Sequence, residues 1–90
     1  MEIVKKIKFK KEPGFIYFLD DGTDRDSSDV IYEPGTLLDL YRSPEDISGI
    51  PEDQDIPIEK VLALRLAPEN GYLYVLDKDG NISRSKVKSL

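Results

Sequence analysis

Carboxylate side chains are the groups in this chain best suited to binding a metal ion. Residues 77–81 read DKDGN, which places oxygen-bearing side chains at alternate positions, as at the start of a calcium-binding helix–loop–helix loop. Such a loop also requires glycine at its sixth position and glutamate at its twelfth, where this chain has Ile82 and Lys88. We therefore expect a hairpin turn in which Gly80 or Asn81 adopts a positive φ, and no metal site.

Five further aspartates form an acidic stretch with enough oxygen atoms for a hard cation but with no recognisable ligand spacing. We expect this stretch to be a solvated loop. Neither acidic segment predicts a metal or another cofactor. The five are Asp20, Asp21, Asp24, Asp26 and Asp29.

The chain contains no histidine and no cysteine. These absences remove the commonest general base, the commonest zinc ligand and any thiolate metal site or disulfide. A hydrolase would then need a carboxylate pair, a lysine base or a bound metal, and nothing in the sequence marks a carboxylate as desolvated. The chain also lacks a glycine-rich phosphate loop. We expect a protein that is not an enzyme.

A short phrase occurs twice, as GFIYFLDDG at 14–22 and GYLYVLDKDG at 71–80. Each copy follows a turn that itself follows an apolar-rich run. We therefore predict two related antiparallel β-hairpins near the two ends of the chain. The second copy, continued to Ile82, resembles the strand–turn–strand phrase of β-propeller blades. A propeller requires roughly four or more blades, and ninety residues hold about two, so this resemblance implies no function.

The expected fold is mainly β with one short helix: a small barrel or sandwich of five or six strands in a single domain over residues 1–90. Thr36 and Asp39 have the spacing of a helix N-cap, which predicts the helix over 36–42, and 43–46 suits one further helical turn. Strands are expected at 2–10, 15–19, 30–32, 58–67, 72–76 and 81–88, the last of them at an edge.

Charge is segregated along the chain, although the total is only −5. Residues 1–11 carry five lysines and one glutamate, residues 12–59 carry fourteen acids and two arginines, and residues 60–90 carry six bases and three acids. Three explanations are open: the basic ends pair with the acidic middle, the charges are all solvated, or the acidic middle attracts a basic partner. The lysine face of 6–10 lacks interleaved aromatics, so nucleic acid is not an expected partner.

The long segment 43–59 contains proline, glycine and no periodicity, which is typical of a functional or disordered loop. Isoleucines stand among acids there, an arrangement that suits contact with a basic protein. The candidate partner-binding residues are Ile47, Ile50, Asp53, Asp55 and Ile56.

The repeated strands are apolar on both faces. We expect the face with Ile16 and Leu73 to be core. The opposite face carries tyrosines that a short helix would cover only in part, which predicts self-association as a dimer. Alternatively, the same rings and an arginine form a nucleotide-like ligand pocket in the dimer cleft. The residues concerned are Tyr17, Tyr72, Tyr74 and Arg65.

The function expected from these features is non-enzymatic protein binding, as an inhibitor or accessory protein of a size that suits a viral origin. Two alternatives remain open: a small-ligand binder, and an acidic mimic of nucleic acid that occupies a basic groove. The sequence shows no apolar run long enough to span a membrane and no secretory signal, so a soluble, cytoplasmic protein is expected.

Overall fold

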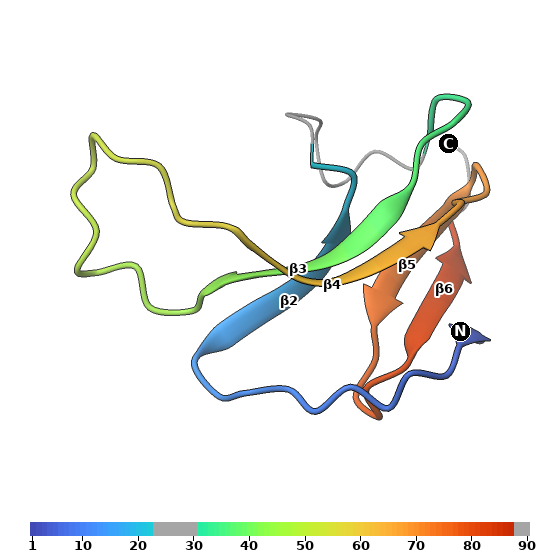
Figure 1. The fold of residues 1–90 in the computed structure, drawn as a ribbon, viewed down its shortest axis with the longest axis horizontal. Coiled ribbons are helices and arrows are strands. Elements are labelled where there is room, and N and C mark those ends of the chain that lie inside the picture. The colour runs from blue at the N-terminus through green and yellow to red at the C-terminus, as the bar shows by residue number, and fades with distance from the viewer. Residues whose placement is uncertain (23–30, 88–90) are drawn as a thin grey trace.

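The computed structural model describes residues 1–22 and 31–87, which form six β-strands (Figure 1). No helix is present among these residues. The prediction of a mainly β fold is therefore confirmed, and the prediction of a short helix is wrong. The strands are β1 (Glu2–Lys5), β2 (Phe15–Asp20), β3 (Leu38–Pro44), β4 (Glu59–Leu66), β5 (Tyr72–Leu76) and β6 (Ile82–Lys86).

The strands make two antiparallel three-stranded sheets, one in the order β1-β6-β5 and the other in the order β2-β3-β4. They are not closed into a barrel. The expected hairpins joining 2–10 to 15–19 and 58–67 to 72–76 do not form, because β1 pairs with β6 and β4 pairs with β3. The final strand is central in its sheet, where an edge was expected.

Strand β3 occupies the segment that was expected to be helical. Leu38 and Leu40 are 2% and 0% exposed, and the residue between them faces the other way, which is the period of a strand. The Asp39 carboxylate accepts a hydrogen bond from the backbone N–H of Arg65 on β4, at 2.9 Å, rather than capping a helix. Residues 43–44 end β3, so no helical turn begins there, and of the expected strand 30–32 the described residues 31–32 are not in a strand.

The hydrophobic core lies between the two sheets. Leu40 and Ile82 are both fully buried, and Leu76 packs with them. A neighbouring cluster contains Tyr32 and Tyr74. One face of each repeated strand therefore packs into the core, and no helix among the described residues covers it.

The expected assignment of the two strand faces is wrong. Ile16 is 52% exposed and Leu73 is 38% exposed, whereas Tyr74 is 6% exposed. The tyrosines can face inward because a nearby backbone amide satisfies each hydroxyl: the N–H of Glu69 donates to Tyr74, and that of Glu12 donates to Tyr17. The tyrosine face is thus the core face.

The repeat extends well beyond the phrase found in the sequence, because β1-β2-β3 and β4-β5-β6 are equivalent halves that exchange their first strands. In one sheet Glu2 pairs with Arg84, and in the other Glu59 pairs with Arg42. Lys8 and Arg65 are the non-glycine residues with positive φ in the described chain, at 48° and 51°. Their backbone N–H groups bind side-chain oxygens of Asn81 and Asp39, respectively.

Candidate functional site

An arm of fourteen residues, 45–58, connects β3 to β4 and projects from the sheets at one end of the longest axis of the molecule (Figure 1). Its internal backbone bonds are short-range: Ile50 N–H donates to the Ile47 carbonyl, and Gln54 N–H donates to the Pro51 carbonyl, both at 3.0 Å. The N–H of Ser48 donates to Asp46, which lowers the pKa of that carboxyl. The arm thus consists of local turns.

The arm is longer than its connection requires. Arg42 of β3 pairs directly with Glu59 of β4, so the two strand ends already lie side by side. A hairpin of this kind is commonly closed by about two to five residues. Glu45, the first residue of the arm, donates its N–H to the Gly14 carbonyl at 3.0 Å beside β2, and the residues after it exceed what closure of the hairpin requires.

The predicted partner-binding residues lie together on this arm. Ile47 and Ile56 are 49% and 44% exposed, Ile50 is half-buried, and Asp53 and Asp55 are exposed. Exposed isoleucines among carboxylates are therefore a property of the folded arm as well as of its sequence. Their role in binding stays a prediction.

The structure places Arg65 apart from the predicted tyrosines, and the role of these residues in self-association or ligand binding stays a prediction. Tyr74 is buried, and Tyr17 and Tyr72 are half-buried. Arg65 lies beside Asp39 in a different hollow from the one that Tyr17 and Tyr74 line together. The guanidinium that does contact Tyr72 and Tyr74 belongs to another residue, Arg84.

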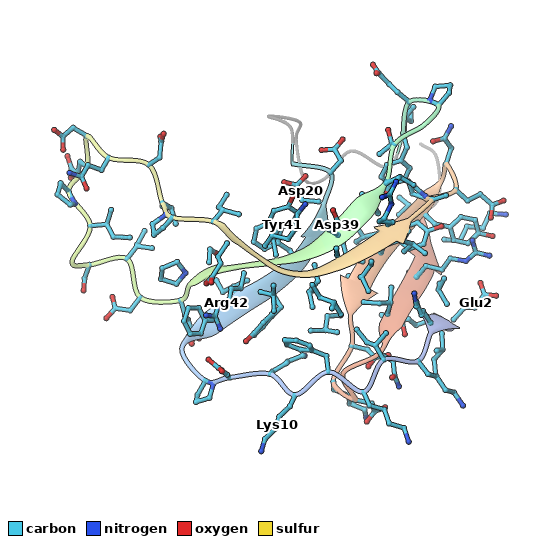
Figure 2. The ribbon with its side chains drawn as sticks, in the orientation of Figure 1. Glu2, Lys10, Asp20, Asp39, Tyr41 and Arg42 are labelled. Atoms are coloured by element: carbon cyan, nitrogen blue, oxygen red, sulfur yellow. The ribbon has the colours of Figure 1, made fainter. Side chains whose placement is uncertain are left out.

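Two arginine-centred clusters, which sequence reasoning missed, occupy equivalent positions in the two halves. The guanidinium of Arg42 lies 3.9 Å from the centre of the Phe15 ring. It pairs with Glu12 at 3.1 Å and with Glu59 at 2.9 Å. Figure 2 shows Arg42 near the base of the arm. A hydrogen bond to the Tyr17 hydroxyl, followed by the one to Glu59, raises the pKa of Arg42.

Arg84 repeats this arrangement in the other half. Its guanidinium lies 4.0 Å from the centre of the Tyr72 ring and pairs with Glu2 at 2.7 Å. It also pairs with Glu69 at 2.8 Å and donates to the Tyr74 hydroxyl. The hydrogen bond to Glu2, followed by the one to Tyr74, raises its pKa. Because each cluster ties a strand of one half to a strand of the other, we assign both a structural role.

A signal for these clusters is present in the sequence. In each half a glutamate stands five residues before the tyrosine whose hydroxyl its own amide binds, Glu12 before Tyr17 and Glu69 before Tyr74. The match therefore extends upstream of the repeated phrase into both turns.

The expected turn at 77–81 is confirmed and connects β5 to β6. The Asp77 carboxylate accepts hydrogen bonds from the Ser83 hydroxyl and from the backbone N–H groups of Asp79 and Asn81. No group of three potential metal-binding side chains occurs in the described part of the chain. Of the other acidic stretch, positions 24, 26 and 29 lie outside the described residues.

The hydrogen bond from Ser83, followed by that from Asn81, lowers the pKa of Asp77. The folded state favours the ionised carboxylate, so this stabilisation is complete above about pH 4 and is lost as the pH falls through the lowered pKa. We predict that Asp77→Asn lowers the urea midpoint at pH 6 and that the difference from wild type shrinks towards pH 2. A difference that stays constant over this range would contradict the prediction. Urea titrations across the pH series supply the measurement.

The basic ends and the acidic arm are not paired with each other. The ion pairs among the described residues join Arg42, Lys60 and Arg84 to acids of the sheets and turns, and none reaches the arm. The lysines of residues 5–11 are exposed, and Lys10 points away from both sheets (Figure 2). The charge segregation of the sequence therefore persists on the folded surface.

No protein-family model, curated protein or solved structure matches this chain. The described residues contain no helix with the length and apolar character needed to cross a membrane.

Proposed function

We propose that this protein is a non-enzymatic binding module that holds a basic protein partner on the arm 45–58. The observation that carries the proposal is the arm itself: it is longer than the hairpin requires, and three of its four isoleucines are exposed. Apolar anchors surrounded by acids combine desolvated contact area with electrostatic steering of a positively charged partner.

The charge of the arm supports this choice of partner. Its fourteen residues include five acids and no lysine or arginine. No ion pair among the described residues neutralises any of them. Exposed apolar side chains are normal when scattered singly, but here Ile47, Ile56 and Ile58 share one projecting segment.

We predict that replacing residues 46–57 with a short Gly-Ser turn abolishes partner binding and leaves the sheets intact. The pairing of Arg42 with Glu59 keeps the strand ends together without the arm. The measurement is affinity capture from native extract with wild-type and arm-replaced bait, followed by titration of the captured protein. Circular dichroism and the thermal midpoint report whether the fold is retained.

Two matched variants separate the contributions of apolar groups and charge. Changing Ile47, Ile50 and Ile56 to serine keeps every acid, and we expect it to weaken binding at least tenfold, as loss of interface anchors does. Changing Asp53 and Asp55 to asparagine keeps every isoleucine and should mainly reduce the association rate and its salt dependence. Full binding by the serine variant, with complete loss between about 50 and 500 mM salt, would instead support nucleic-acid mimicry. Capture that is unaffected by arm replacement would refute the proposal.

A further inference from the structure

The N-terminal segment of residues 1–11 is an exposed surface with the opposite charge from the arm. It carries five lysines and one glutamate, and its lysine side chains are exposed. Apolar side chains are exposed in it too: Met1 at 81%, Ile3 at 50% and Val4 at 37%. The segment thus has the same combination of apolar groups and charge as the arm, with the sign reversed.

The two surfaces cannot satisfy each other within one molecule as the chain is folded. The arm lies at one end of the longest axis, and the N-terminus lies towards the other end (Figure 1). That axis measures 36 Å. No ion pair among the described residues joins a lysine of residues 5–11 to an acid of the arm. Among the ion pairs between described residues, the one that involves the N-terminal segment joins Glu2 to Arg84.

We propose that two copies of this chain associate about a two-fold axis, with the arm of each copy lying on the N-terminal segment of the other. The charges match in number as well as in sign, since five arm carboxylates face five lysines. Exposed isoleucines of the arm meet Met1, Ile3 and Val4, which gives the contact a dehydrated centre. This inference rests on the proposed function of the arm and identifies the basic surface that the arm binds as the N-terminal segment of a second copy.

The placement of the two surfaces permits a closed two-fold arrangement. The arm projects from one end of the molecule, and the N-terminal segment runs from near the other end back to Lys10 (Figure 2), so two copies arranged side by side and antiparallel can make both contacts at once. Such an arrangement is closed and leaves neither surface free, whereas a head-to-tail contact would continue into a filament. The assembly is therefore a dimer.

Charge reversal tests this pairing. One variant changes Glu52, Asp53 and Asp55 to lysine, and a second changes Lys5, Lys6 and Lys10 to glutamate. All six side chains are exposed, so neither variant should disturb the core. In sedimentation equilibrium, the wild type should have twice the 10.2 kDa mass of the chain at low salt. Each variant alone should dissociate with a Kd raised more than tenfold.

Combining the two sets of charge reversals should restore dimer formation. An equimolar mixture should form a heterodimer, because the lysine-bearing arm meets the glutamate-bearing segment and the two native surfaces meet each other. A chain carrying all six reversals should again form a homodimer. Neither recovery is expected if the reversals merely damage the fold, and unchanged circular dichroism provides a direct check of the fold.

Several outcomes would overturn the inference. A wild-type protein that is monomeric at about 50 mM salt, where screening is weak, excludes the dimer. Variants that dimerise as wild type does, or a mixture that stays monomeric, exclude this particular contact. If the wild type is monomeric while the intact arm still captures a basic protein from extract, this inference fails and the proposed function stands. If arm replacement changes neither the mass of the assembly nor the capture of a protein from extract, both this inference and the proposed function fail.

Discussion

Replacing Leu40 with alanine should lower the free energy of unfolding by about 2–5 kcal/mol, the range for large-to-small changes at fully buried sites. Leu40 has no exposed surface and joins the two sheets by packing with Leu76 and Ile82. Domains of this size are stable by only about 5–15 kcal/mol in total, so the variant loses a large share of its stability. Urea denaturation followed by circular dichroism measures the effect.

A matched control stands opposite Leu40 in the same sheet. Leu62 pairs with it across β3 and β4 but is 38% exposed, so Leu62→Ala should cost less than about 1 kcal/mol. Because Ile82 is the equivalent of Leu40 in the other half and is also fully buried, Ile82→Ala should match the loss at Leu40. Equal losses at Leu40 and Leu62 would show that the core is not between the sheets.

Replacing Gly80 with alanine should be at least as damaging. The backbone of Gly80 has φ of 80°, and a Cβ atom there would lie 2.1 Å from the carbonyl oxygen of Phe9. Phe9 cannot easily retreat, because its N–H donates to the Gly80 carbonyl at 2.8 Å. The variant should lose about 2–5 kcal/mol from left-handed strain and steric overlap together, or fail to fold.

Gly71 serves as a control that separates the steric overlap with Phe9 from the strain of a positive φ. Its φ of 89° is similar and its carbonyl also accepts a backbone hydrogen bond, but apart from the two adjacent residues no atom would lie within 4 Å of a Cβ at this position. Gly71→Ala should therefore cost only the conformational strain, about 1–2 kcal/mol. Urea midpoints of the two variants give the comparison. If both glycines prove equally tolerant of alanine, the close approach of residue 9 to the turn is wrong.

The strands that were predicted correctly have local signals. The repeated phrase forms β2 and β5, and the apolar run 58–67 contains β4 although its residues are also good helix formers. Leu62, Leu64 and Leu66 alternate in the sequence but do not share one face of β4, because the β3–β4 pairing shifts register at irregularities. Leu62 is left exposed while the other two pack against the core.

The helix predicted over 36–42 failed because a capping pattern is a local preference that tertiary contacts can override. Asp39 has the spacing of a capping residue, but in the folded protein its carboxylate binds Arg65 from a distant strand and the Lys60 ammonium at 3.2 Å. Burial of Leu38 and Leu40 against the opposite sheet requires a two-residue period. No feature within the segment itself distinguishes these two outcomes.

The prediction assigned the wrong faces of β2 and β5 to the core, again because contacts from outside the segment decide the outcome. The hydroxyls of Tyr17 and Tyr74 accept hydrogen bonds from the amides of Glu12 and Glu69, which lie outside the strands that carry the tyrosines. The arm was recognisable in advance because a stretch of proline, glycine and acids without a period suits no packed element. The sequence alone does not show that the arm is longer than the hairpin requires, because this depends on the pairing of Arg42 with Glu59.

The exchange of first strands also bears on how the protein is made. During synthesis β1 emerges from the ribosome long before its partner, since the bond from Arg84 to Glu2 spans 82 positions. The sheet β2-β3-β4 can assemble on the nascent chain, whereas β1 stays unpaired until β6 has been synthesised. Contacts so distant in sequence slow folding, and a neighbouring nascent chain could supply the missing strand in the interval.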